Sequence, residues 1–204
     1  MDRNVDAIVV GADCRPVTRQ PADNRGPMYE AITIRANALR NSGGASPAEI
    51  ARLYLAAAGG GFPPAQNSLG NLYEQGLGVE QSNPQAAYCY RRAAEQGEPR
   101  AQHSLGAMYL QGRDAPKDPA EGVSWLRHSA DQGHAAACAD LANLYCKGEN
   151  VPRNQTRALA WWLIAAGLGD GKSAGLSAKA KREMGVAEIA AAEEIARNWI
   201  RNAR

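Results

Sequence analysis

The chain has 204 residues, an apolar fraction of 45% and a formal net charge of only +2 at pH 7. This apolar fraction is sufficient for a sizeable core. The mixed charges, without a basic run, argue against a dedicated nucleic-acid or anionic-membrane surface. No stretch of about 18 apolar residues could span a membrane.

The N-terminal region, residues 1–27, holds three prolines, balanced charges and no periodic apolar pattern. Such a composition predicts a disordered or loosely attached arm. Its apolar run, Ala7–Val10, is too short for the core of a secretory signal. We therefore expect a cytoplasmic protein, or a periplasmic one if an upstream signal sequence was lost.

Residues 28–64 are expected to form a degenerate helix pair. Ser46 followed by Pro47 supplies an N-cap acceptor and a proline at the first helical position of the second helix. The helix before it, about Met28 to Asn41, lacks the pattern that the following residues repeat.

A period of 36 residues begins at residue 65. Each period opens with a small residue, followed by a leucine, a small residue, an apolar residue and a tyrosine: Ala65, Leu69, Gly70, Leu72 and Tyr73; Ala101, Leu105, Gly106, Met108 and Tyr109; Ala137, Leu141, Ala142, Leu144 and Tyr145. Spacings of 4, 7 and 8 residues fall on one face of a helix. A glycine then ends each of these first helices at Gly76, Gly112 and Gly148.

The second half of each period predicts a second helix. An N-cap acceptor begins it at Asn83, Asp118 and Asn154, and a glycine ends it at Gly97, Gly133 and Gly169. Cys89-Tyr90, Trp125-Leu126 and Trp161-Trp162 share one position, so we interpret the tryptophan pair as part of the core. The periods define units 65–100, 101–136 and 137–172.

The last residues, 173–201, read as a capping unit. In the final helix, Ile189, Ala192, Ala196 and Trp199 make an apolar stripe with charged residues outside it. A terminal repeat must cover exposed core on one side and face water on the other. Together these patterns predict an all-α solenoid of stacked helix pairs over residues 28–201.

The pattern resembles the Sel-one-like repeat family, a branch of the tetratricopeptide superfamily. Leu69-Gly70-x-Leu72-Tyr73-x2-Gly76-x-Gly78-Val79 carries the resemblance, whereas the later units depart at Asp114-Ala115 and Asn150-Val151. The resemblance implies a right-handed α-α superhelix of about five antiparallel helix pairs, ending in a C-terminal capping helix. It also implies a concave surface that binds a protein or peptide.

By analogy with tetratricopeptide domains, outward residues of each first helix would line that concave surface. The predicted partner-binding residues are Asn67, Asn71, Glu74, Gln75, His103, Gln111, Asn143 and Lys147. Amide side chains there could hydrogen-bond the backbone of an extended peptide. The alternative is that these are solvated side chains on exposed faces, as most surface polar residues are.

The function that we expect is a non-enzymatic adaptor with a protein or peptide partner, no cofactor, no metal and no small-molecule substrate. One alternative is an exported envelope regulator acting on a sensor kinase or on cell-wall assembly. Another is a hydrolase resembling β-lactamases, but no serine here has a lysine three residues later. Gly171-Lys172-Ser173 matches a relaxed phosphate-binding loop, which we interpret as the turn between two units.

The remaining reactive side chains suggest no further site. Cys14, Cys89, Cys138 and Cys146 lack the spacing of redox or zinc motifs, which favours free thiols in a reducing compartment. His134 and Cys138 are four residues apart, but two ligands do not complete a zinc site.

Overall fold

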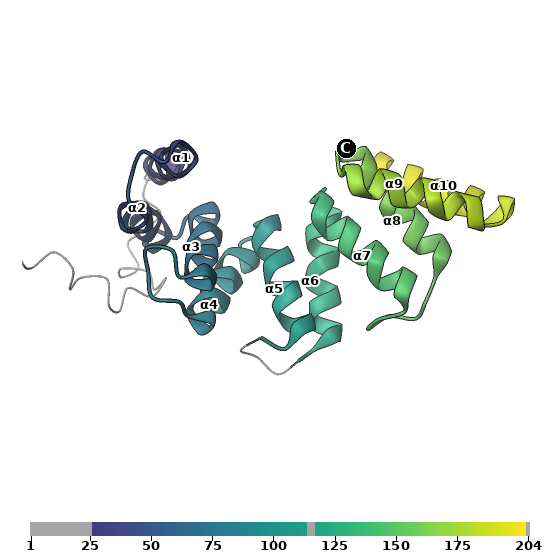
Figure 1. Ribbon diagram of the computed structural model, residues 1–204, viewed down its shortest axis with the longest axis horizontal. Coiled ribbons are helices and arrows are strands. Elements are labelled where there is room, and N and C mark those ends of the chain that lie inside the picture. The colour runs from purple at the N-terminus through teal and green to yellow at the C-terminus, as the bar shows by residue number, and fades with distance from the viewer. Residues whose placement is uncertain (1–25, 114–116, 203–204) are drawn as a thin grey trace, which may run out of the picture. The chain divides into compact units, whose positions relative to one another are not determined.

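The computed structural model describes residues 26–113 and 117–202, and every regular element in these ranges is an α-helix. The ten described helices follow one another as five consecutive pairs, as the sequence predicts (Figure 1). The chain divides into two compact units, residues 1–101 and 102–204, which we describe separately. Most of the predicted N-terminal arm lies outside the described residues, and its last two residues, Gly26 and Pro27, begin the first helix.

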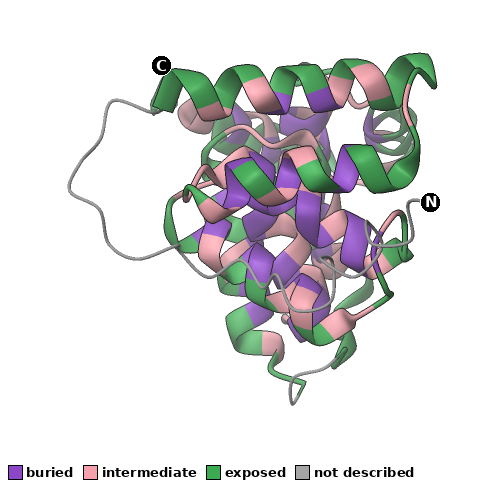
Figure 2. Ribbon diagram, turned by 90° about the vertical axis from the view of Figure 1, so that its left-hand side faces the viewer, coloured by how far each residue is buried: buried purple, intermediate pink, exposed green. Residues whose placement is uncertain are grey.

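Unit 1 contains α1 (Gly26–Ser42), α2 (Pro47–Gly59), α3 (Pro63–Gln75) and α4 (Asn83–Glu95), and it ends just inside α5 (Pro99–Gln111). Each of the first three helices packs on the next. Tyr54, Leu69 and Tyr90 are fully buried between them. Figure 2 shows buried positions on the faces that neighbouring helices turn toward each other. One apolar face per helix is therefore enough to build this core.

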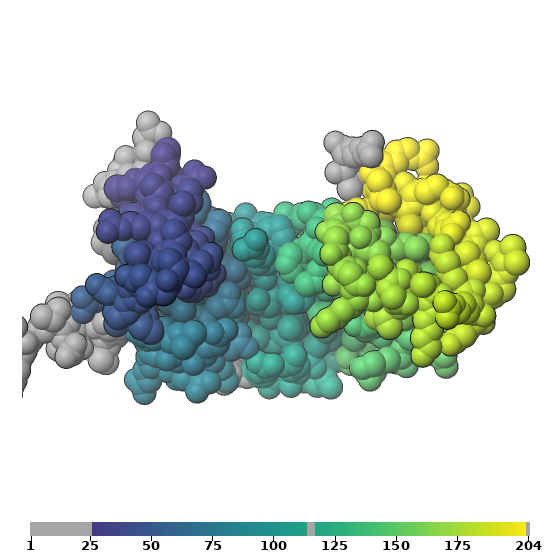
Figure 3. All heavy atoms as spheres, turned by 45° about the horizontal axis from the view of Figure 1, so that its top comes forward, coloured from purple at the N-terminus to yellow at the C-terminus, as the bar shows by residue number. Residues whose placement is uncertain are grey.

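Unit 2 contains the rest of α5, then α6 (Pro119–Asp131), α7 (Ala135–Lys147), α8 (Gln155–Gly167), α9 (Gly171–Glu183) and α10 (Val186–Asn202). Figure 3 shows α9 and α10 as the yellow-green to yellow atoms. Both helices pack against α8. Ala192 and Ala196 of α10 are buried, and Trp199 meets Trp161 edge-on with ring centroids 6.4 Å apart. The predicted apolar stripe of the last helix therefore covers the core as expected.

Two glycine pairs show why the sequence repeats this residue. Gly76 and Gly148 end α3 and α7 with φ angles of 68° and 74°, a left-handed conformation that costs glycine little. Gly106 and Gly122 instead let α5 and α6 approach closely. A Cβ atom on Gly106 would lie 2.9 Å from the carbonyl oxygen of Gly122.

The helix boundaries differ from the predicted ones in two respects. The first helices begin two residues before the predicted unit starts, at Pro63, Pro99 and Ala135. Pro63 and Pro99 are already in a helical φ and need no amide hydrogen at the first position, so they extend α3 and α5. The N-cap of α4 is Ser82, whose Oγ accepts from Gln85 N, and not Asn83. The caps predicted at Ser46, Asp118 and Asn154 are confirmed.

A buried glutamine pair recurs in the repeat and was not predicted from the sequence. Gln66 Oε1 accepts from Gln96 Nε2 at 2.8 Å, and Gln102 Oε1 accepts from Gln132 Nε2 at 2.7 Å. Gln66 and Gln102 are both buried. The second pair lies 36 residues after the first, so the repeat register could have revealed these glutamines. In the next repeat Cys138 replaces the first glutamine and Leu168 the second, which removes both partners together.

The cysteine prediction is partly wrong. Cys138 and Cys146 carry free thiols as expected, but Cys89 is disulfide-bonded. Spacing along the chain does not reveal which distant segments approach each other, and it was the only criterion used. Cys14 lies outside the described residues. The thiol argument for a reducing compartment therefore fails. In addition, none of the described helices is long and apolar enough to cross a membrane.

Candidate functional site

The predicted partner-binding residues of unit 1 lie on α3, but most of them are occupied within the fold. Gln75 is exposed, whereas Asn71 and Glu74 are half-buried. Asn67 is only 5% exposed, so the predicted exposed position is wrong for this residue. It lies in the half of α3 nearer its N-terminus, where the helix is covered on more than one face.

Tyr90 explains why Asn71 and Glu74 are half-buried. Its side chain on α4 is fully buried, and its hydroxyl oxygen lies 2.7 Å from Asn71 Oδ1 and 2.9 Å from Glu74 Oε2. Tyr54 of α2 repeats the arrangement by donating to Asn37 Oδ1 at 2.6 Å. A buried phenol needs such an acceptor. These asparagines therefore support the core of unit 1, a role that the sequence analysis did not assign to them.

The first predicted partner-binding residue of unit 2, His103, connects α5 to α7. His103 Nε2 lies 2.8 Å from Asp140 Oδ2, and its ring centroid is 5.0 Å from that of His134. Gln111, at the end of α5, is exposed. His103 is thus held in place from a neighbouring helix, which also restricts how it could meet a partner.

Asn143 and Lys147, on α7, border an open pocket of about 560 Å³. The pocket is lined by the second half of α7, by the loop before α8, and by the first residue and the middle of α8. The region from α9 to the start of α10 completes the lining. Lys147 is exposed and lies 3.8 Å from Glu149, a pair that surface solvation makes weak. Asn143 is half-buried, and no side-chain hydrogen bond to another described residue forms there.

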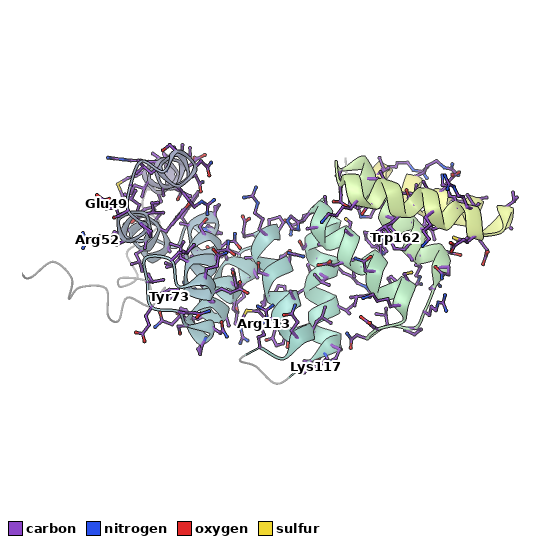
Figure 4. All side chains as sticks on the ribbon, viewed as in Figure 1. Glu49, Arg52, Tyr73, Arg113, Lys117 and Trp162 are labelled. Atoms are coloured by element: carbon purple, nitrogen blue, oxygen red, sulfur yellow. The ribbon has the colours of Figure 1, made fainter. Side chains whose placement is uncertain are left out.

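Trp162 of α8 lines the same pocket (Figure 4). Its side chain is 5% exposed and packs with Ala142, Tyr145 and Ala158, which confirms the predicted core position. The indole Nε1–H is nevertheless buried without a hydrogen-bond partner. An unpaired buried donor of this kind costs about 1–3 kcal/mol.

The repeat register relates this tryptophan to the tyrosine of unit 1. Asn71 faces Tyr90 in one repeat, Ala107 and Leu126 hold the equivalent positions in the next, and Asn143 and Trp162 hold them in the third. The first pair is hydrogen-bonded and the second is apolar. Only in the third does a buried donor remain without an acceptor among the described residues. Asn71 and Asn143 are therefore equivalent in sequence but not in bonding.

The two motifs that suggested other chemistry find no support. Gly171-Lys172-Ser173 forms the first turn of α9 and follows helix α8, not a strand. Asp170 caps this turn by accepting from Ser173 N at 2.8 Å. Hydrogen bonding with Ser173 lowers the pKa of the Asp170 carboxyl group. No cluster of three or more potential metal ligands occurs within residues 26–113 and 117–202.

Consecutive helix pairs with recurring glycine and aromatic positions define a helical repeat protein of the α-α superhelix class. The sequence matches the Sel1 repeat at residues 63–98, 99–134 and 135–170, more than half of the chain. The chain therefore belongs to the Sel1 repeat family, as the resemblance indicated. Proteins of this family are generally protein-interaction modules without catalytic activity.

Solved structures agree with this assignment. A Sel1 repeat protein from Oxalobacter formigenes is 29% identical over 74% of this chain, with a TM-score of 0.64. A protective antigen of uropathogenic Escherichia coli strains with this repeat fold is 30% identical over 86%, with a TM-score of 0.69. The chain spans 63% and 38% of their respective lengths. Among curated proteins, none matches the chain significantly.

Proposed function

We propose that the chain is a non-enzymatic adaptor that holds a protein or peptide segment on the polar surface of its first helices. The observation that carries the proposal is the surface around the end of α7, where Asn143 and Lys147 border the 560 Å³ pocket. Adaptor function in this family and the modest net charge are consistent with a protein partner.

The two units contribute differently to this function. In unit 1, Asn71 Oδ1 and Glu74 Oε2 both lie within hydrogen-bond distance of the Tyr90 hydroxyl, which makes these two side chains less available to a partner. In unit 2, Asn143 keeps its amide free of side-chain hydrogen bonds within the described part of the chain, and Lys147 remains exposed. Unit 2 is therefore the main contact region, and Gln111, at the exposed end of α5, adds an auxiliary contact in the same unit.

Affinity capture from a lysate of the source organism tests the proposal. The bait is the full chain, compared with a variant that combines Asn143→Ala and Lys147→Glu. We expect mass spectrometry to identify proteins that the wild type retains and that this variant loses at least about fivefold, since one lost polar contact costs on the order of 1 kcal/mol.

The matched control is Lys172→Glu, a charge reversal at an exposed position of α9 that does not line the pocket. It should capture the same proteins as the wild type. Equal capture by all three baits, with unchanged helical circular dichroism, would remove the assignment of this surface.

A further inference from the structure

The pocket in unit 2 combines a buried hydrogen-bond donor with an uneven distribution of charge. Trp162, whose indole Nε1–H is buried and unpaired, lines the pocket together with the apolar residues Leu176, Ala180 and Met184. Pockets of this volume range usually bind a ligand group through a mainly apolar wall and a few placed polar groups.

Trp162 requires an acceptor. Indole Nε1–H is a donor only, so neither a cation nor an N–H group could pair with it. In the equivalent position of unit 1, the Tyr90 hydroxyl meets Asn71 and Glu74. The residues of α7 in register with these two are Asn143 and Cys146, and both line the pocket. Where unit 1 has the Glu74 carboxylate, the third repeat has a cysteine and open space.

The charges around the pocket favour a negative group on one side. Lys147 and Arg153 come from the end of α7 and the loop before α8, and Lys179 comes from α9. Neither Arg153 nor Lys179 forms an ion pair with another described residue. The two acidic residues of the lining, Glu183 and Glu188, belong to the end of α9 and the start of α10.

Glu183 ends α9, and Glu188 lies in the first turn of α10. Glu188 Oε2 accepts from Gly185 N at 3.0 Å, so this carboxylate is already engaged at the helix start. The part of the lining that comes from α7, the following loop and α8 thus carries basic groups and donors but no carboxylate. A carboxylate is the common group that accepts from an indole, an amide and an ammonium group together.

We propose that this pocket binds a carboxylate of an acidic peptide segment, which replaces the acceptor that Glu74 supplies in unit 1. Trp162 Nε1–H and Asn143 Nδ2 donate to the carboxylate, and Lys147 and Arg153 neutralise it. The proposal rests on the proposed adaptor function and names the chemistry of its partner. The carboxylate belongs either to an Asp or Glu side chain or to a chain terminus.

A randomised 12-residue peptide library displayed on phage, selected on the full chain, is the first part of the test. We expect the enriched peptides to contain more Asp and Glu than the input library. Peptides synthesised from the enriched set are then measured with and without an amidated C-terminus, and with Asp and Glu replaced by Asn and Gln. Loss of binding in one arm or the other identifies the source of the carboxylate.

The second part follows the tryptophan directly. The four tryptophans give four indole ¹H–¹⁵N signals, and Trp162→Phe identifies that of Trp162. Adding an enriched acidic peptide should shift this signal, whereas the amide-substituted peptide should not. Lys147→Gln should weaken binding about five- to hundredfold, and Lys172→Gln should leave it unchanged. The Lys147 and Lys172 side chains are exposed, so these variants stay informative even if Trp162→Phe does not fold.

The outcomes separate the two proposals. The carboxylate pocket is overturned if the enriched peptides lack acidic residues, if they do not shift the Trp162 signal, or if Lys147→Gln binds them as tightly as the wild type. None of these results contradicts the adaptor function. If no peptide is enriched and no protein is retained in the capture experiment, both proposals fail.

Discussion

Cys138 and Cys146 lie on the same helix, α7, but their thiols have different surroundings. Cys138 is fully buried and its Sγ lies 3.8 Å from the carbonyl oxygen of Ala130. Burial, with a smaller contribution from Asp131, raises the pKa of this thiol to about 12. Cys146 is half-buried and lines the pocket. Two positions eight residues apart therefore differ in chemistry because one faces the core and the other the site.

Alkylation of the native protein tests this difference. With the pKa at about 12, only about one Cys138 thiol in ten thousand is ionised near pH 8, and only the thiolate reacts. We expect iodoacetamide to modify Cys146 first and to leave Cys138 intact until the protein unfolds, as measured by peptide mass spectrometry. In guanidinium chloride both should react alike. Equal rates in the native protein would contradict the burial of Cys138.

At the scale of elements, glycine has opposite effects in two helices of unit 2. Gly122 in α6 is buried, and a Cβ atom there would lie 2.8 Å from Leu110 Cγ and 2.9 Å from the carbonyl oxygen of Gly106. Gly175 in α9 is exposed, and an added Cβ atom would meet nothing within 4 Å. The first glycine is required by packing, whereas the second only weakens its helix.

The two alanine variants should therefore change stability in opposite directions. Gly175→Ala removes a poor helix former and should stabilise the protein by up to about 1 kcal/mol. Gly122→Ala gains the same helix propensity but must separate α5 from α6, so we expect a net loss of about 1–3 kcal/mol. Urea unfolding followed by circular dichroism measures both. A stabilising Gly122→Ala would show that this close approach is not required.

The elements themselves were largely predictable, and the site was not. The 36-residue register fixed the helix pairs because glycines and aromatic residues recur in phase, and the last apolar stripe was correctly predicted to cover the core. Exposure within a helix depends on neighbours that a repeat consensus does not specify. Asn67 was therefore misplaced, and the bonding of Asn71 to Tyr90 was missed although both residues were already in the alignment. The unpaired Trp162 donor required the structure, because its neighbours come from three helices.

At the scale of the whole molecule, the two units are built from the same repeat but differ in whether its buried hydrogen-bond donors have acceptors within the fold. Unit 1 pairs its buried aromatic hydroxyls with its own asparagines. Unit 2 leaves a buried donor unpaired beside a basic pocket wall. A repeat protein can change one helix pair without disturbing the others because each pair mainly contacts its neighbours. Partner binding should accordingly depend on α7 to α9 more than on α3.

Site-specific photocrosslinking in a lysate of the source organism tests this claim most directly. A benzophenone side chain replaces Gln155, which lines the pocket at the start of α8, in one protein and Lys172, on the same unit but outside the pocket, in another. We predict that irradiation joins a discrete partner protein to the first and not to the second. Adducts of equal yield at both positions, or none at position 155 in a protein that keeps its helical content, would contradict the account.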